Sequence, residues 1–416
     1  MKINTTRTIN ELVSAMAYVL DVLSENTNLY HSWRVGIFAS ELSKAIAPDE
    51  RKNIFYSALL HDIGYLALPS NDISYYLSLG EDPIKNPTIL SHPLIGAEII
   101  SSIPNLSAVA KIVLNHHEWY NGRGYPLGKQ GSEISETAQI LLSADHIDMV
   151  LRFEPARNIN ALTKIIMGWS NERISSALAS KLLDVFRQNA YLLETIEQDA
   201  IIKLFEKVRS ETGMIQIQDN VDAIGITCEV FSQLIDTKHP TMIGHSKRVS
   251  KYSLLIALSM NLSHDEITKI KWAGLLHDVG KLGISKKLVN KPACLSADEY
   301  ELMKKHSFFT RKILETITDF GDIAFIAGSD HERYDGTGYP AGLKGEQIPM
   351  GSRIISIADA FDAMTSKRPY RKAMPYKEAC KEIEKNAGSQ FDSDVVKAAI
   401  PVLRNISAVF AQRLSV

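Results

Sequence analysis

The sequence predicts an all-α protein made of two tandem helical bundles. Apolar residues recur at three- and four-residue spacing through most of the 416-residue chain, and alternating strand patterns are nearly absent. Polar landmarks in the first half of the chain return at a constant offset in the second half. Together these observations indicate two copies of one mostly helical unit.

The expected helices follow from the apolar spacing. In the first copy they cover residues 9–23, 30–46, 51–60, 95–103 and 108–119. Two glycine-rich loops, 121–126 and 335–340, both end in Gly-Tyr-Pro and punctuate the helices. A helix at 189–209 leads to the junction, and one at 220–234 either closes the second core or packs between the units. Ser263 and Glu266 form the pattern of a helix-opening capping box.

The repeat is measured by matching residues. Tyr125 and Tyr339 differ by 214 in position (339 minus 125). The same offset relates the pairs His31 and His245, His92 and His306, His117 and His331, and Asp145 and Asp359. The pairs His61-Asp62 and His277-Asp278 differ by 216 in position (277 minus 61). The second copy is therefore two residues longer before its His-Asp pair and two residues shorter after it. The expected domains are 1–208 and 216–416.

Composition narrows the class of partner. A net charge of -2 gives no electrostatic reason to expect polymeric nucleic acid. No apolar run approaches the roughly 20 residues that span a bilayer, and the N-terminus lacks a signal-like apolar region. The three cysteines are isolated, so a disulfide framework or zinc knuckle is not expected. We expect a cytoplasmic protein with reduced thiols and no membrane partner.

Imidazoles and carboxylates recur beside apolar helical stretches. Inward-facing carboxylates need protons, cations or each other, and a mixed nitrogen and oxygen set in a helical bundle suits two metal ions such as manganese or iron. In the second unit the set is His245, His277, Asp278, His306, Asp330, His331 and Asp359. In the first unit the parallel set, a second candidate metal site, is His31, His61, Asp62, His92, His116, His117 and Asp145.

Three histidines, 146, 239 and 264, fall outside these sets, and we expect them to be solvated or capping residues. Gly280 is expected to end the helix that carries His277 and Asp278. Lys281 would then point back over His277 and Asp278.

The order of these motifs closely resembles the HD-GYP phosphodiesterases, a branch of the HD superfamily, over residues 236–396. The matching segments are His245 to Val249, His277 to Lys281, Asp330 to Pro340, Asp359 to Thr365 and Arg368 to Tyr370. The first unit resembles the family more weakly, because it lacks the Arg-Pro-Tyr segment. The resemblance implies two tandem HD-type helical bundle domains.

The resemblance also implies a metal-dependent phosphodiesterase. It would hydrolyse a cyclic dinucleotide, cyclic di-GMP or 3',3'-cyclic GMP-AMP, to a linear dinucleotide by means of metal-activated water. Two divalent ions are expected in the second unit, manganese or iron, with magnesium or nickel as alternatives. His277, Asp278 and Lys281 would be catalytic, Asp278 by bridging the ions and Lys281 by facing the scissile phosphate.

Further substrate contacts are predicted at Tyr339, Arg353 and Arg368. Each has a structural alternative. The two arginines can form salt bridges within the protein, and the Gly-Tyr-Pro loop can be a rigid turn that shapes the mouth of the site.

Two departures from the family pattern matter. Asp330 stands where the family usually has histidine, which makes the site harder and more anionic. Thr241 stands where some relatives carry a glutamate for a third metal, so two ions are expected. In the first unit Tyr65 replaces the phosphate-binding lysine. We therefore expect the second unit to be catalytic and the first to support or regulate it.

Rival interpretations remain open at the level of sequence. One is an HD-superfamily nucleotidase or alarmone hydrolase, against which the Gly-Tyr-Pro loop argues. Another is a non-catalytic scaffold that binds nucleotides. A homodimer or protein partner, engaged through the first unit, is a further expectation.

Overall fold

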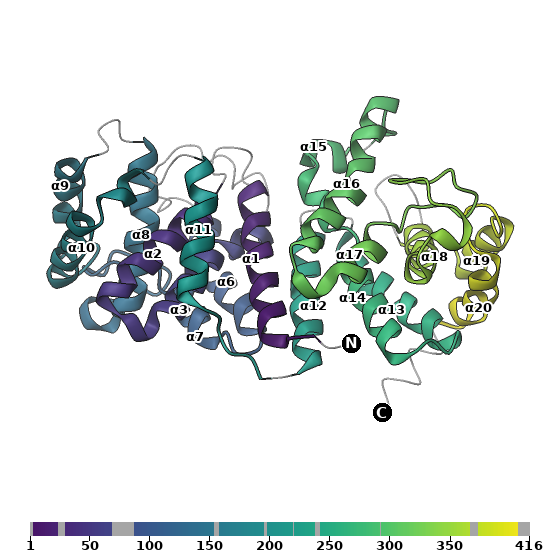
Figure 1. The fold of residues 1–416 in the computed structure, drawn as a ribbon, viewed down its shortest axis with the longest axis horizontal. Coiled ribbons are helices and arrows are strands. Elements are labelled where there is room, and N and C mark those ends of the chain that lie inside the picture. Colours follow the sequence, from purple (N-terminus) through teal and green to yellow (C-terminus); the bar gives the residue numbers. More distant parts are fainter. Residues whose placement is uncertain are drawn as a thin grey trace. The chain divides into compact units, whose positions relative to one another are not determined.

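The computed structural model describes residues 3–23, 30–68, 87–153, 158–194, 198–218, 220–237, 242–291, 293–366 and 373–406. Within these ranges the chain is helical, and isolated β-bridges are the only extended pairings (Figure 1). The predicted all-α class is confirmed. The chain folds as two compact units, Asn4–Ile226 and Thr227–Val416, called the N-terminal and C-terminal units below.

The N-terminal unit begins with a long helix and continues through short helices and 3₁₀ turns. In chain order these are α1 (Thr5–Leu23), α2 (His31–Ile46), η1 (Pro48–Glu50), α3 (Arg51–Leu60), η2 (Ile63–Ala67), α5 (Pro87–Leu90), α6 (His92–Ser101), α7 (Ser107–Leu114), η4 (Gly131–Glu133), α8 (Glu136–Phe153), α9 (Ile159–Trp169), α10 (Ser176–Gln188), η5 (Ala190–Glu194) and α11 (Gln198–Thr212).

The C-terminal unit repeats this order. The helix α12 (Val221–Thr237) contains the boundary between the units. It is followed by α13 (His245–Ser259), α14 (His264–Leu276), η7 (Val279–Gly283), α15 (Lys286–Val289), α16 (Ala297–Glu315), η8 (Thr318–Phe320), α17 (Gly321–Ala327), η9 (Gly345–Gln347), α18 (Met350–Thr365), α19 (Tyr376–Lys385) and α20 (Ser393–Arg404).

Predicted and observed helices agree best where apolar spacing is regular. The helix expected at 51–60 is observed as α3. The prediction of a helix at 108–119 is wrong about where the helix ends, because α7 stops at Leu114. There the backbone tightens, with Asn115 N–H bonding the Ile112 carbonyl, and the His116 imidazole bonds the Val113 carbonyl. The segment expected as one helix at 189–209 is divided between η5 and α11.

The core of the N-terminal unit is built on α2, which packs against α3, α8 and α11. Trp33 of α2 stacks on Phe205 of α11 with ring centroids 4.3 Å apart. The segment after α11 is tied to α1, since the Asn10 amide exchanges hydrogen bonds with the backbone N–H and carbonyl of Ile215. The residues just before position 217 therefore pack with the N-terminal unit.

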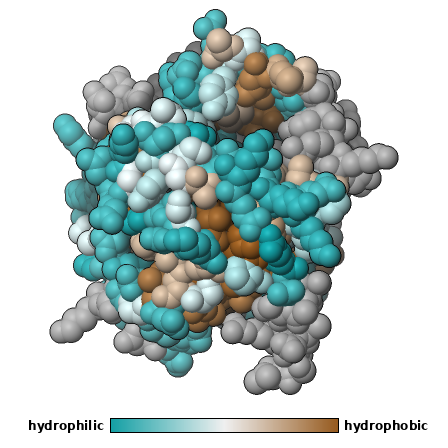
Figure 2. Space-filling model, turned by 90° about the vertical axis from the view of Figure 1, so that its right-hand side faces the viewer, coloured by the Kyte–Doolittle hydropathy of each residue, from teal (hydrophilic) through white to brown (hydrophobic). Residues whose placement is uncertain are grey.

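The core of the C-terminal unit is built on α13, which packs against α14, α18 and α20. The helix α16 packs on η7 and α17, and Trp272 stacks on Phe320 at 5.9 Å. Seen from the end that carries α19 and α20, the surface shows hydrophobic patches separated by hydrophilic side chains (Figure 2). The packing brings together α13, α16, α18 and the segments that follow α14 and α17, which carry the predicted ligands.

Candidate functional site

The His277-Asp278 pair lies just past the end of α14. The helix ends at Leu276, His277 is its C-cap residue, and Asp278 leads into the tight turn η7. A Cβ atom at Gly280 would lie only 1.9 Å from the His306 carbonyl oxygen of α16. Gly280 is therefore required for close approach of two backbones. This corrects the expectation that it ends the helix.

The C-terminal unit brings its seven predicted ligands into one largely buried cluster. They come from α13, the turn between α14 and η7, α16, the segment after α17, and α18. Three of them offer ligand atoms that all lie within 4.8 Å of one another, namely His245, His277 and Asp359. On the other side of Asp278, the rings of His306 and His331 lie 4.9 Å apart, and His331 Nε2 is 3.5 Å from Asp330 Oδ2.

Asp278 faces two groups of histidines with different oxygens. Its Oδ2 atom lies 3.5 Å from His245 Nε2 and 3.6 Å from His277 Nε2. Its Oδ1 atom lies 3.8 Å from His306 Nε2. A carboxylate in this position can offer one oxygen to each of two cations. The geometry thus supports the bridging role predicted for Asp278.

Hydrogen bonds at the outer nitrogen orient His277 and His306. Nδ1 of His277 donates to the Gly274 carbonyl at 3.0 Å, and Nδ1 of His306 donates to the Met303 carbonyl at 2.7 Å. With the proton assigned to Nδ1, the Nε2 lone pair points into the cluster. This is the tautomer that a histidine requires to bind a metal through Nε2.

Several buried atoms of the cluster lack a hydrogen-bond partner among the described residues. They are Nε2 of His245 and His277, Oδ1 of Asp278 and both carboxylate oxygens of Asp330. Asp330 is only 1% exposed, and this burial raises the pKa of its carboxyl group. An unpartnered buried carboxylate costs several kcal/mol. Inward lone pairs from nitrogen and oxygen fit divalent cations, and the group of side chains is therefore suited to bind metal.

The pKa shifts of the histidines agree with this interpretation. Burial, followed by the charges of His331 and Lys281, lowers the pKa of His306 to about 3, so its imidazole is neutral at pH 7. Burial alone would lower the pKa of His245, but Asp278 and Asp362 raise it to about 9. The cluster is thus anionic enough to hold a proton on His245, which a metal ion would displace.

Lys281 lies against the bridging carboxylate. Its ammonium group is 2.5 Å from Asp278 Oδ2. Burial would raise the pKa of Asp278, but the Lys281 ammonium and the His277 imidazole hold it well below its usual value. The structure therefore places the Lys281 ammonium beside the cluster, and its predicted contact with a phosphate stays a prediction.

The Gly-Tyr-Pro loop contacts a predicted ligand, His331. The Tyr339 ring stacks on His331, with centroids 5.0 Å apart and planes 24° apart. Glu332 is buried and accepts hydrogen bonds from the backbone N–H groups of Ala341 and Leu343. The loop is held close to the cluster, which supports the rigid-turn alternative for it. The direct contact of Tyr339 with substrate stays a prediction.

Two supporting residues were missed at the level of sequence. Asp362 accepts a hydrogen bond from His245 Nδ1 at 2.8 Å and from Arg248 Nε at 2.6 Å. Asp148 does the same for His31 and Arg34 in the N-terminal unit. The signal was available, because Asp148 and Asp362 keep the 214-residue offset and lie one helical turn beyond the last ligand.

The predicted arginine contacts are less well supported. Arg353 forms an ion pair with Asp392, with Nη1 2.6 Å from Oδ2, and both side chains are largely buried. This geometry favours the structural alternative over contact with substrate. Arg368, Thr241 and His239 lie outside the described residues.

The N-terminal unit contains the parallel cluster. Asp62 Oδ2 lies 3.4 Å from His61 Nε2 and 3.7 Å from His31 Nε2, while its Oδ1 lies 3.7 Å from His92 Nε2. Two groups of potential ligands thus lie on either side of Asp62. They are His31, His61 and Asp145, and His92, His116 and His117.

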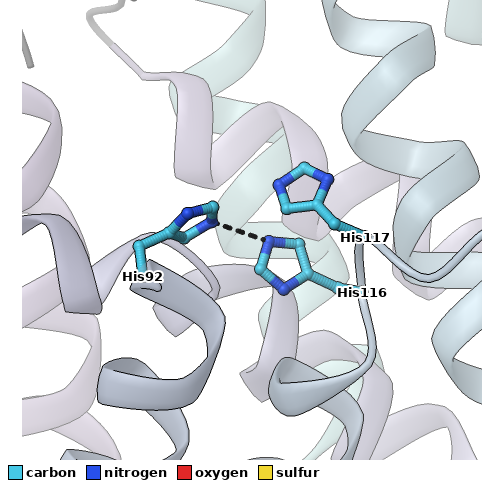
Figure 3. A group of neighbouring side chains, drawn as sticks. All are labelled: His92, His116 and His117. Carbon is cyan, nitrogen blue, oxygen red and sulfur yellow. Dashed lines mark hydrogen bonds between the residues drawn. The ribbon is translucent and has the colours of Figure 1, made fainter. Parts of the chain in front are cut away.

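Nitrogen atoms with lone pairs face one another in this second cluster. His92 Nε2 and His116 Nε2 are 3.3 Å apart (Figure 3), although both Nδ1 atoms donate to backbone carbonyls, of Ile89 and Val113. With burial as the main cause, the pKa of His92 falls to about 4 and that of His116 falls well below its usual value, so neither ring carries a second proton at pH 7. Two lone pairs this close repel each other unless a cation lies between them.

Two residues distinguish the N-terminal cluster. Tyr65 stacks on the His92 ring at 4.0 Å, where the C-terminal unit has a lysine. His146 is buried, with Nδ1 bonding the Leu142 carbonyl and its ring 6.4 Å from that of His117. The expectation that His146 is solvated or capping was wrong, because α8 turns this residue inward beside the cluster. His264 is exposed on the first turn of α14, after the confirmed capping box.

Comparison with known families decides the class. A model described as HD domain matches residues 14–166 and 229–395, most of both units. The chain belongs to the HD domain family. Its predicted HD-GYP character is confirmed by its relatives, since it is 30% identical to the 3'3'-cGAMP-specific phosphodiesterase 3 of Vibrio cholerae over 76% of this chain and 68% of that protein.

Two further similarities extend this result. The chain is 34% identical to a cyclic di-GMP phosphodiesterase of Thermotoga maritima, over 57% of this chain and 63% of that protein. A crystal structure of a cyclic GMP-AMP-specific phosphodiesterase from Vibrio cholerae matches with a TM-score of 0.64 and 24% identity, covering 96% of this chain and 98% of that one. The structural match shows that this chain has the same fold as that phosphodiesterase.

None of the helices within the described ranges is both long and apolar enough to cross a bilayer.

Proposed function

We propose that this HD domain protein is a metal-dependent phosphodiesterase that hydrolyses a cyclic dinucleotide to a linear dinucleotide. The names of its relatives support the substrate class, either 3',3'-cyclic GMP-AMP or cyclic di-GMP. The observation that carries the proposal is the position of Asp278, which faces histidines with both oxygens while Lys281 lies against it.

The residues of the C-terminal unit divide into three roles. His245, His277 and Asp359 would hold one divalent ion and His306, Asp330 and His331 the other, with Asp278 shared between them. When bound, such a pair lowers the pKa of water and neutralises charge on a phosphoryl group. The Lys281 ammonium adds positive charge where the phosphate becomes more negative, and the Asp330 carboxylate favours ions that prefer oxygen ligands, such as manganese or magnesium, over iron.

For the N-terminal unit we propose a metal-binding domain without substantial turnover. Its facing histidine nitrogens support metal binding. Tyr65 offers no positive charge, and its stacking on His92 places an aromatic ring where the C-terminal unit has an ammonium group. This observation favours the scaffold or receptor hypothesis for this unit alone, in a supporting or regulatory role. The proposal includes a homodimer or protein partner through this unit and a cytoplasmic location.

The test is hydrolysis of a panel of cyclic dinucleotides with manganese or iron. The double variant His277→Ala/Asp278→Ala should lose activity. The matched variant His61→Ala/Asp62→Ala should retain the chemical step and lower activity only through support of its partner. Loss confined to the second variant would refute the assignment of the working unit. Metal analysis of the same variants separates an enzyme from a metal-free scaffold.

A further inference from the structure

An exposed aromatic side chain lies beside the cluster of the C-terminal unit without a role in holding it. Tyr300 is on the first turn of α16 and is 47% exposed. Its ring packs edge-on against Tyr339, with centroids 6.4 Å apart and planes 86° apart. Since Tyr339 in turn stacks on His331, Tyr300 is one ring removed from a predicted metal ligand.

An ammonium group accompanies this pair of rings. Lys304, one helical turn after Tyr300, places Nζ 5.0 Å from the Tyr300 centroid and 5.7 Å from the Tyr339 centroid. Its Nζ also donates to Glu301 Oε1 at 2.6 Å, which holds it at this end of α16. We call Tyr300, Tyr339 and Lys304 the aromatic platform. It presents an open ring and a positive charge together, next to the cluster.

At the positions that match Tyr300 and Lys304, the sequence of the N-terminal unit has neither an aromatic residue nor a lysine. The offset of 214 that relates His92 to His306 places Asn86 at the position of Tyr300 and Leu90 at that of Lys304. The N-terminal unit also has Tyr65 at the position where the C-terminal unit has Lys281. The two units therefore share six of the seven predicted ligand positions, with His116 standing where the C-terminal unit has Asp330. They also differ at Lys281, Tyr300 and Lys304, as expected if these three side chains contact substrate.

The chemistry of the platform fits a nucleobase. A base lies one ribose away from its phosphate, so a phosphate at the cluster leaves the base to be held by the neighbouring surface. Flat rings stack on aromatic side chains whatever the base, and a nearby ammonium group adds a favourable interaction with the ring and the phosphate. An aliphatic or peptide ligand would gain little from an exposed tyrosine edge-on to a second one.

We propose that the aromatic platform is a nucleobase-binding subsite, in which Tyr300 stacks on one purine of the substrate and thereby sets substrate affinity. This inference rests on the proposed function for its place in catalysis, but the subsite can be tested by binding alone. Tyr300 would be a specificity-determining residue, without a part in holding metal.

The experiment compares Tyr300→Ala, Tyr300→Phe and wild type in the full-length, metal-loaded protein. Steady-state hydrolysis of the preferred cyclic dinucleotide should show KM raised roughly tenfold in Tyr300→Ala with kcat nearly unchanged, because stacking is made equally in the ground and transition states. Tyr300→Phe keeps the ring and should behave like wild type. Isothermal titration with GMP, AMP and inorganic phosphate measures the subsite directly.

The control variant is Phe308→Ala. Phe308 is 49% exposed on the same helix, about two turns after Tyr300, and its ring neighbours are Phe309 and Lys312. It should leave KM and nucleotide affinity unchanged. Tyr300→Ala should weaken GMP and AMP about tenfold while phosphate binds as in wild type.

The outcomes separate the two proposals. If wild type hydrolyses no cyclic dinucleotide, the proposed function fails, and the titrations with GMP and phosphate still decide the subsite. If wild type is active but Tyr300→Ala keeps wild-type KM and GMP affinity, the subsite is refuted and the proposed function stands. Equal loss of GMP and phosphate affinity would also refute the subsite, because it would show a general disturbance of the cluster.

Discussion

Replacing Asp362 by asparagine tests how the protein holds its ligands. Asp362 accepts the Nδ1 proton of His245 at 2.8 Å, and it pairs with Arg248 through Nε at 2.6 Å and Nη2 at 3.0 Å. Asparagine keeps the shape but removes the charge that orients the imidazole. Loss of such a supporting carboxylate typically lowers metal affinity or activity about 10- to 100-fold, or roughly 1.4–2.7 kcal/mol.

The same substitution in the N-terminal unit provides a matched control. Asp148 also bonds a histidine, His31, but its guanidinium partners Arg34 and Arg152 are more buried, with side chains 5% and 12% exposed against 37% for Arg248. Removing one partner of a buried ion pair lowers the free energy of unfolding by about 3–5 kcal/mol, whereas removing one partner of a partly exposed pair lowers it much less. Asp148→Asn should therefore mainly lower stability, and Asp362→Asn mainly activity.

Two measurements are needed. Hydrolysis is assayed at saturating manganese, and unfolding in urea is monitored separately by tryptophan fluorescence. Three of the four tryptophans, at positions 33, 119 and 169, lie in the N-terminal unit, so fluorescence chiefly reports its unfolding. Asp148→Asn should shift the unfolding midpoint strongly to lower urea. The reasoning would be refuted if Asp362→Asn kept wild-type activity and metal affinity. It would also be refuted if both variants lost activity equally at urea concentrations below their unfolding transitions.

Three further predictions follow from single contacts. Lys281→Met should lower kcat about 10²- to 10³-fold without loss of bound metal, as measured by single-turnover hydrolysis and metal analysis, because it removes charge stabilisation beside the phosphate; unchanged kcat would contradict that role. Gly280→Ala should destabilise the C-terminal unit and release metal, since its Cβ would lie 1.9 Å from the His306 carbonyl, whereas Gly321→Ala, with open space around it, should be neutral or stabilising in thermal unfolding. In the native protein a thiol reagent should modify exposed Cys294 and spare the two buried cysteines, whose pKa values burial raises; rapid reaction of all three would be the contrary result.

Sequence alone was sufficient for the class of fold and for listing the residues that the structure brings together as candidate ligands. Helical spacing is a local property, so α3 could be located from its apolar residues. The ligands were recognised because a tandem copy keeps functional residues at a constant offset, as for His92 and His306. Helix ends were less predictable, since α7 stops where a side chain, His116, takes the place of a backbone donor.

What only the tertiary structure decided is which groups face one another. Neighbours in sequence did not show that Asp278 directs its two oxygens to different histidines, that Asp362 orients His245, or that Arg353 is bound to Asp392. These contacts join residues up to 117 positions apart and depend on how helices pack. The sequence determined what chemistry the protein carries, and the packing of helices decided how each atom is used, because a side chain's partners are set by distance in space.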